Sequence, residues 1–243
     1  MLLNMIINGF SVSAVFHDDS VNSIFKPMLR DLAQLFYERK RRVVAFIAAP
    51  PAVGKSTLSA FLQYLSGNME DMPKVQAIGM DGFHYPQKYI LEHTVIRDGK
   101  EQPMKCYKGA PDTFDIALLN SKINELYEKD TVLWPIYDRR LHDVQEDAVK
   151  VNAPIVLLEG NYLLLDAPVW RDLRHDYSIF ISAEENQLRD RLIARKMKGG
   201  SSIQEAEAFY DRCDGPNVRI CLENRLPADL LLQMTGDGEF RKI

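Results

Sequence analysis

The hydrophobic positions of this 243-residue chain form two patterns: short continuous apolar runs, and stretches with apolar residues three or four positions apart. Continuous runs are typical of strands buried on both faces of a sheet, whereas the wider spacing is typical of helices with one buried face. The runs predict strands or extended segments at residues 43–49, 75–80, 131–138, 153–160, 177–183 and 228–236. The wider spacing predicts helices at residues 54–66, 113–128, 184–200 and 202–213. This alternation predicts an α/β fold with a mostly parallel, doubly wound sheet and helices on both of its faces.

The start of the chain follows a different pattern. Residues 1–18 alternate between apolar and polar side chains around Asn8-Gly9, a dipeptide that favours tight turns, and they predict a β-hairpin. Residues 20–39 have apolar side chains at helical spacing. Because proline fits the first turn of a helix, Pro27 predicts that the helix proper begins near that position.

The hairpin and helix precede the regular part of the chain. We therefore expect residues 1–40 to form an appendage packed on a main domain that spans residues 41–243. Within the main domain, residues 82–112 are rich in charged residues, prolines and glycines, and they predict an irregular segment.

Composition narrows the class of protein. Hydrophobic residues make up 46% and charged residues 26%, which is typical of globular domains, and the net charge of −4 gives no reason to expect a nucleic-acid partner. The sequence has no run of 18 apolar residues, so it predicts no membrane span. The three cysteines, Cys106, Cys213 and Cys221, form no C-x-x-C pair and predict free thiols in a reducing compartment. We therefore expect a cytoplasmic protein.

The sequence "AAPPAVGKST" nearly matches the phosphate-loop pattern G-x-x-x-x-G-K-[ST], but Ala49 stands where the pattern has its first glycine. A residue before proline favours extended geometry, so Ala49 is expected to continue the preceding strand. Pro50 and Pro51 have no N–H to donate, but the amides nearest the following helix make the phosphate cradle. We expect the loop to bind phosphate without the glycine.

The second half of this pattern supplies the groups that hold a nucleotide. Lys55 would reach the β- and γ-phosphates, and the hydroxyl of Ser56 would hold Mg²⁺. The amides expected to cradle the phosphates belong to Val53, Gly54, Lys55, Ser56 and Thr57. The alternative is a strand, turn and helix without a ligand.

Two acidic residues follow predicted strands. Asp81 ends "VQAIGMD" and Glu159 ends "PIVLLEG", so in a parallel sheet both would lie at the same edge as the phosphate loop. Phosphoryl transfer to an alcohol needs one carboxylate near the acceptor hydroxyl and another near the metal. A helix cap or a surface turn remains the alternative for each residue.

Several motifs together resemble one family. From about residue 42 to residue 235, the chain resembles the P-loop kinases that include pantothenate kinase, uridine kinase and phosphoribulokinase. More narrowly, it is similar to bacterial pantothenate-kinase-like proteins and fructose-transport kinases. The motifs that carry the resemblance are "PAVGKST", "MDGFHYP", "KGAPDTFD", "WPIYDRRLHD", "IVLLEGNYLLLD" and "DGPNVR".

The resemblance implies a role for each matching residue. Asp81 would act as the base on the acceptor hydroxyl, and Glu159 would help Ser56 to order Mg²⁺. Asp112 and Asp115 border the acceptor segment, where Asp115 is also a candidate helix cap. The residues implied in acceptor binding are Asp81, His84, Lys108, Tyr137, Arg139, His142 and Asn217.

The family also has a basic lid over the nucleotide. Arg191 and Arg195 lie four positions apart on one face of a predicted helix and would stabilise charge on the transferred phosphoryl group. The alternative is a solvated helix face whose arginines pair with neighbouring acids: Glu184, Glu185 and Asp190. Residues 214–219 have the composition of a turn, and only the resemblance places them near the site.

The sequence therefore predicts an ATP-dependent kinase that uses Mg²⁺ and transfers a phosphoryl group to a hydroxyl of a sugar, a nucleoside or a pantothenate-like metabolite. A nucleotide-driven switch that acts on a protein partner is the alternative, and a nucleic-acid 5′-kinase is disfavoured by the acidic charge balance. We expect a small-molecule substrate and neither a nucleic-acid partner nor a membrane. A homodimer is one assembly that these features allow.

Overall fold

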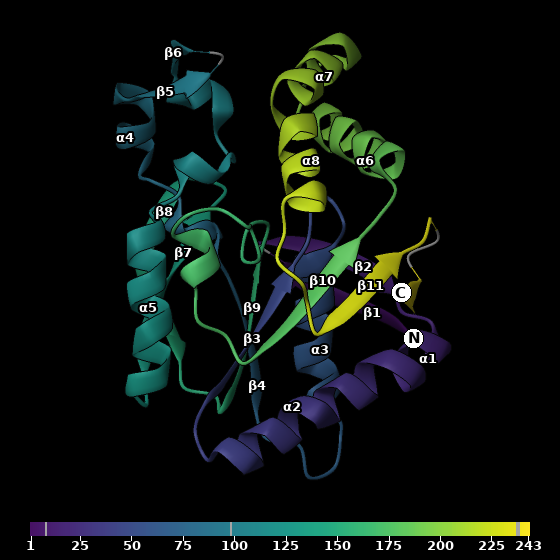
Figure 1. The fold of residues 1–243 in the computed structure, drawn as a ribbon. Helices are drawn as coiled ribbons and strands as arrows, with labels where there is room; N and C mark the ends of the chain where they lie inside the picture. The colour runs from purple at the N-terminus through teal and green to yellow at the C-terminus, as the bar shows by residue number, and fades with distance from the viewer. Residues whose placement is uncertain (8, 98, 237–238) are drawn as a thin grey trace.

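A central sheet organises the computed structural model, which describes residues 1–7, 9–97, 99–236 and 239–243 (Figure 1). Among these residues, six strands make the sheet in the order β12-β11-β10-β3-β9-β4. They are β3 (Val43–Ala48), β4 (Val75–Gly79), β9 (Ile155–Gly160), β10 (Tyr177–Ser182), β11 (Leu230–Met234) and β12 (Phe240–Lys242). All neighbouring pairs are parallel except β11 and β12. The predicted mostly parallel α/β sheet is confirmed.

The strands at the centre of the sheet are the most apolar ones. Every residue of β3 and β9 is buried, and the two strands pair in register from Val43 with Ile155 to Ala48 with Gly160. A continuous apolar run suits this place because both of its faces are covered. The antiparallel edge strand β12 was not predicted, since it has only three residues, two of them exposed and charged.

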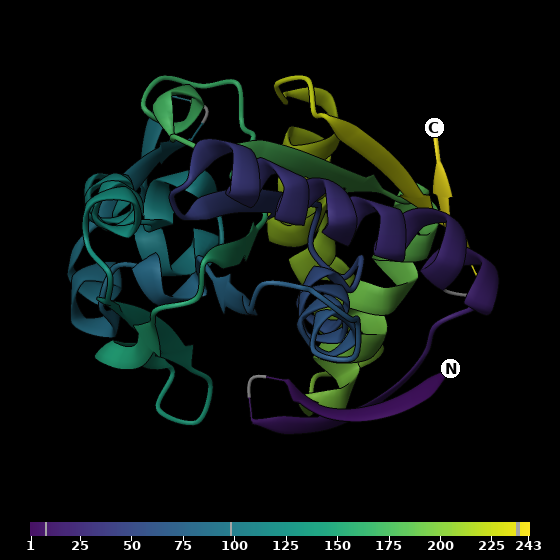
Figure 2. The same cartoon turned by 90° about the horizontal axis from the view of Figure 1, so that it is seen from below.

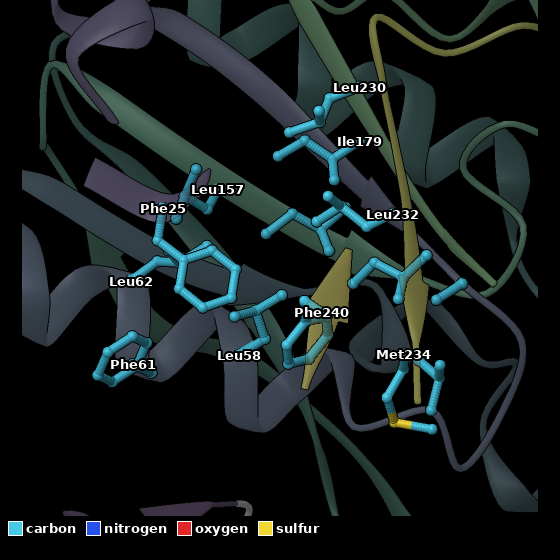
Figure 3. Close-up of a cluster of buried hydrophobic side chains, with 14 of the residues drawn as sticks. Phe25, Leu58, Phe61, Leu62, Leu157, Ile179, Leu230, Leu232, Met234 and Phe240 are labelled. Carbon is cyan, nitrogen blue, oxygen red and sulfur yellow. The ribbon is translucent and has the colours of Figure 1, made fainter. Parts of the chain in front are cut away.

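Two apolar clusters cover the two faces of the sheet. One contains side chains from α2 (Lys26–Arg39), α3 (Lys55–Ser66) and α6 (Glu185–Lys198), and Figure 3 shows part of it around Phe25, Leu58 and Phe240. The other contains side chains from α5 (Ile116–Glu128), β7 (Val132–Asp138) and α8 (Gly215–Glu223). Helices therefore lie on both faces, as the sequence pattern predicts.

The chain starts with the predicted antiparallel hairpin. Its strands are β1 (Leu2–Ile7) and β2 (Phe10–Val15), while Asn8 of the predicted turn lies outside the described residues. The following helical segment begins earlier than expected, because α1 (Asp18–Ser20) and a π-helical turn (Val21–Phe25) lead directly into α2.

Proline 27 occupies the first turn of α2, which explains why the helix tolerates it. Phe25 and Leu29 are fully buried in the same apolar cluster as the central strand β3. Residues on both sides of position 40 thus share one core. The division into an appendage and a kinase domain stays a prediction.

The segment 82–112 is more ordered than predicted. It contains α4 (Gln87–Glu92), the short hairpin of β5 (Thr94–Arg97) and β6 (Lys100–Pro103), and 3₁₀ turns at Met104–Tyr107 and Pro111–Thr113. The prediction of an irregular segment was wrong because these elements are too short for a clear hydrophobic period. Their small apolar cluster consists of Ile90, Val95 and Met104.

Two further elements differ from the prediction. A missed strand, β8 (Asp143–Val151), pairs with β7, and its largely polar exposed side chains explain why it carries no apolar run. The predicted turn at residues 214–219 is wrong, because α7 (Ile203–Phe209) continues through a π-helical turn (Tyr210–Asp214) into α8. The proline that suggested a turn stands in the first turn of α8, where it needs no N–H.

A carboxylate between β3 and β10 ties the sheet to α2. Asp176, whose side chain is 2% exposed, accepts hydrogen bonds from Arg41 at 2.7 Å, from Arg39 at 2.5 Å and from the Val44 amide at 3.0 Å. Burial by itself would raise the pKa of Asp176, but these donors outweigh burial and lower it. The ionised carboxylate is thus favoured in the folded state.

Replacing Asp176 with asparagine should lower the free energy of unfolding by about 2 kcal/mol at pH 7, since charge-assisted hydrogen bonds are lost. Because the folded state lowers this pKa, the carboxylate stabilises the protein above about pH 4 and loses that effect as pH falls through the folded pKa. Urea unfolding at pH 7 and at about pH 3 should therefore show a smaller difference at the lower pH. The exposed Asp172→Asn variant is the control, and an equal deficit at both pH values would contradict the ionic role.

Candidate active site

The phosphate loop connects β3 to α3 as the sequence predicts. Ala49 is buried, and its amide donates to the Gly160 carbonyl at 3.4 Å, so the residue in place of the first glycine extends the strand pairing. The chain then turns through Ala52 and Gly54, whose φ angles of 65° and 96° lie in the left-handed region. Helix α3 begins at Lys55, and its first amides point out of the helix end, where anions bind.

A buried carboxylate stands directly beside this helix end. Ser56 Oγ donates to Glu159 Oε1 at 2.7 Å, and Glu159 is 9% exposed. Burial raises the pKa of Glu159, the nearby charge of Lys55 opposes that rise, and the charge of Asp81 adds to it. Bringing a cation to this carboxylate would offset the cost of its burial.

The space beside Glu159 depends on a glycine in the neighbouring strand. Gly79 of β4 pairs with Glu159, and a Cβ atom at Gly79 would lie 3.3 Å from Glu159 Oε1. Two hard oxygen ligands at a phosphate loop match the requirements of Mg²⁺, which keeps waters and phosphate oxygens as its remaining ligands. Ser56 and Glu159 therefore fit the predicted magnesium site.

The second predicted acid lies in a 3₁₀ turn, Asp81–Phe83, just after β4. Its side chain is 43% exposed and pairs with Arg139, with Nη2 and Oδ2 3.6 Å apart. A Cβ atom at Gly82 would lie 2.2 Å from the Pro135 carbonyl oxygen, so only glycine lets β7 approach this closely. The close approach brings the segment with Arg139 to Asp81.

Polar side chains from three separate segments come together where the sequence predicts that the acceptor binds. Lys108 Nζ donates to Tyr137 Oη at 2.8 Å, to Gln87 Oε1 at 2.6 Å and to the His142 carbonyl at 3.3 Å. The ring of His84 lies edge-on to Tyr137, with centroids 5.6 Å apart. Gln87 was missed by the sequence reasoning, because no motif marks it.

The predicted acceptor residues differ in burial. Burial lowers the pKa of His84, which favours a neutral ring. His142 is exposed in the turn between β7 and β8, and its carbonyl, not its imidazole, meets Lys108.

The two aspartates that border the acceptor segment have partners of their own. Asp112 is exposed and forms a two-point ion pair with Arg97 at 2.8 and 2.9 Å. Asp115 caps α5 by accepting from the Leu118 amide at 2.9 Å, which confirms the expected cap.

Residue Asn217 reaches the acceptor segment from helix α8. Its side chain is buried, 6% exposed, and its amide nitrogen would lie 3.9 Å from a Cβ atom at Gly109. Cys213 Sγ approaches the Lys108 carbonyl at 3.8 Å, and Tyr162 Oη donates to the Gly109 carbonyl at 2.7 Å. The structure therefore brings this part of the chain to the acceptor segment, as the resemblance implies.

The two arginines of the predicted lid face the site. Arg191 Nη1 approaches the Ala52 carbonyl at 3.4 Å and Met234 Sδ at 2.9 Å. Arg195 is exposed at the surface, where partial loss of hydration lowers its pKa while the nearby charges of Asp214 and Asp81 oppose that change. Glu185 instead pairs with Arg219 at 2.9 Å. Figure 1 shows α6, α7 and α8 beyond the carboxyl ends of the strands.

The chain is similar to known proteins over most of its length. No family model matches the sequence. The chain is 42% identical to "Uncharacterized protein YggC" of Escherichia coli over 99% of this chain and 98% of that protein. It is 30% identical to a pantothenate kinase of Bacillus subtilis over 90% of this chain and 82% of that protein. The chain belongs to the P-loop kinases of the pantothenate kinase and uridine kinase group.

A solved structure extends this relationship to the fold. The "putative fructose transport system kinase" of Silicibacter sp. TM1040 superposes on this P-loop kinase with a TM-score of 0.72 and 32% identity, over 84% of this chain and 98% of that one. The predicted P-loop fold and family are confirmed. The protein is thus an ATP-dependent phosphotransferase that acts on an alcohol and uses Mg²⁺. The roles assigned above to single residues stay predictions.

Proposed function

We propose that this kinase transfers the γ-phosphoryl group of ATP to a hydroxyl of a sugar, a nucleoside or a pantothenate-like metabolite. The observation that carries the proposal is the position of Asp81, which stands beside the phosphate loop and Glu159 on one side and the polar group of Lys108, Tyr137 and Gln87 on the other. A nucleotide switch without an acceptor has no need of the second group.

Each side chain of the proposed site has one role in phosphoryl transfer. The amides at the start of α3 and the ammonium group of Lys55 hold the phosphates, and Asp81 accepts the proton of the acceptor hydroxyl. The hydroxyl oxygen then forms a bond to the γ-phosphorus while the bond to the ADP oxygen breaks. Mg²⁺ held by Ser56 and Glu159 would neutralise charge on the phosphates when bound.

The charged residues above the loop complete the proposed mechanism. Arg191 and Arg195 approach from α6 and would stabilise the negative charge of the transferred group. Arg139, paired with Asp81, would orient the base, while Lys108 and Asn217 would bind polar groups of the acceptor. His84 and Tyr137 would form part of the same acceptor surface, and His142 would border it.

An ADP-release assay tests the proposed function. The purified protein with Mg²⁺ and ATP is given D-fructose, uridine, pantothenate and other hydroxyl-bearing metabolites one at a time. At least one compound should raise ADP release above the rate with ATP alone and should gain a phosphate by mass spectrometry. ATP hydrolysis that no metabolite changes, but that a protein partner raises, would instead identify a nucleotide switch.

The cysteines support a proposal for the surroundings of the protein. Cys106, Cys213 and Cys221 are all free, which supports a reducing compartment and, we propose, the cytoplasm. Each helix that the structure describes is too short or too polar to span a lipid bilayer. A homodimer and the absence of a nucleic-acid partner stay predictions.

A further inference from the structure

The hollow beside Asp81 has a wall that the kinase motifs do not explain. Its volume is about 500 Å³, and Ser56, Asp81 and Glu159 line its floor. On one side it is bounded by Ile6, Ile7, Gly9 and Phe10, which belong to the tip of the N-terminal hairpin. Figure 2 shows this purple hairpin running beside α3 toward the β7–β8 side of the molecule.

Two apolar side chains at the hairpin tip lie on the face that carries Leu3 and Met5. They are Phe10, which is 59% exposed, and Ile7, which is half-buried and pairs with Phe10, whereas Ile6 projects from the other face. Water contact with such side chains is unfavourable by roughly 25 cal/mol for each Å² that could be buried. Contiguous exposed apolar groups at the rim of a hollow commonly mark a binding site.

The base of the same hairpin is firmly held. The ring of Phe16, just after β2, stacks on Phe61 of α3 with centroids 3.7 Å apart, and the N-terminal ammonium group donates to the Phe16 carbonyl at 2.6 Å. Leu3 and Met5, which alternate with the exposed positions, pack against the main apolar cluster. The uncovered tip is therefore positioned by a buried base and not by contacts of its own.

Another part of the lining comes from β7 and the residues that follow it. Ile136 of β7 is 36% exposed and faces the hollow, followed by Tyr137. Arg139 and Arg140 come next in the chain and line the same hollow. An occupant would therefore meet apolar groups at the two walls and charged groups near Asp81.

We propose that the hairpin tip is an apolar wall of the acceptor pocket. The inference rests on the proposed function, and it narrows the substrate class to alcohols that carry an alkyl or aromatic group near the phosphorylated hydroxyl. Such a molecule places its hydroxyl at Asp81 and its apolar part against Ile7, Phe10 and Ile136. A free sugar with hydroxyls on every side leaves these side chains in contact with water and gains nothing from them.

Methyl NMR of isoleucine-labelled protein, with Mg²⁺ and a non-hydrolysable ATP analogue, tests this inference with simple probes. The probes are primary alcohols from ethanol to 1-hexanol. Affinity should rise about threefold for each added methylene, since burying one methylene is worth up to about a fourfold gain. The resonances of Ile7 and Ile136 should shift, while those of Ile203 and Ile243, exposed elsewhere, should not.

A double variant, Ile7→Ser with Phe10→Ser, should remove most of the gain with chain length. Both residues lie at the tip, beyond the buried base of the hairpin, so the fold should persist. Val15→Ser on the same hairpin is the matched control, because Val15 is 54% exposed and lies outside the hollow. Affinity that does not depend on chain length, or an unchanged gain in the double variant, would overturn the inference.

The outcome separates this inference from the proposed function. Alcohol binding requires no phosphoryl transfer. If affinity rises with chain length but no metabolite is phosphorylated, the proposed kinase function of this pocket is rejected and the apolar wall is retained. If a metabolite is phosphorylated but alcohol affinity does not rise with chain length, the apolar wall is rejected and the proposed function is retained.

Discussion

Replacing Asp81 with asparagine should lower kcat for phosphoryl transfer about a thousandfold and change the Kd for ATP by less than about threefold. Positioned general bases contribute roughly 10²–10⁴ in rate, and asparagine keeps the size of the side chain but accepts no proton. Asp81 pairs with Arg139 at the floor of the hollow and lies after β4, beyond the magnesium ligands Ser56 and Glu159 that we propose. The nucleotide should therefore bind almost unchanged.

Calorimetric titration with a non-hydrolysable ATP analogue and single-turnover transfer to the best acceptor measure the two quantities. Asp115→Asn is the matched control, because Asp115 caps α5 and asparagine caps helices equally well. That control should keep full activity. A loss of ATP affinity in Asp81→Asn as large as the loss of rate would show that Asp81 acts on the metal or the fold.

Replacing Lys55 with alanine should have the opposite signature. We expect the Kd for ATP to rise about a hundredfold, since hydrogen bonds to charged groups contribute about 1.5–3 kcal/mol and about 1.4 kcal/mol corresponds to a factor of ten. Lys55 also opposes the rise that burial causes in the pKa of Glu159. Its removal leaves that carboxylate without its nearby cation and adds to the loss of Mg²⁺–ATP binding.

The same calorimetric titration, with and without Mg²⁺, measures this effect. Lys198→Ala serves as the control, because Lys198 is exposed at the end of α6 and the variant makes the same change of charge. ATP affinity equal to that of the wild type in Lys55→Ala would rule out the loop as the phosphate cradle.

The sequence predicted those elements whose residue types follow from their own local position, such as a strand covered on both faces or a turn that needs glycine. β3, β9 and β10 read as apolar runs because both of their faces are covered, and α3 follows a turn that needs Gly54. The acids at the ends of two such strands could be located from the same rule, because parallel strands end at one edge.

Other features depend on contacts between distant segments and left little trace in the sequence. Lys108 meets Gln87, Tyr137 and His142, all of which lie more than about 20 positions away along the chain, and no spacing rule connects them. Strand β8 forms by pairing with β7 and not by apolar alternation. The turn expected at residues 214–219 is helical because proline in a first turn leaves the helix intact.

Helix α3 joins the two halves of the reaction in one rigid body. Its first turn, from Lys55, is the proposed phosphate cradle, and Phe61 on the same helix stacks on the Phe16 ring at the base of the hairpin. At 1.5 Å per residue these two points are about 9 Å apart along the helix axis. With the proposed phosphate cradle and the proposed acceptor wall on one helix, folding of the protein would already align donor and acceptor. The substrates would then lose less freedom of movement on the way to reaction than they would between separately moving parts.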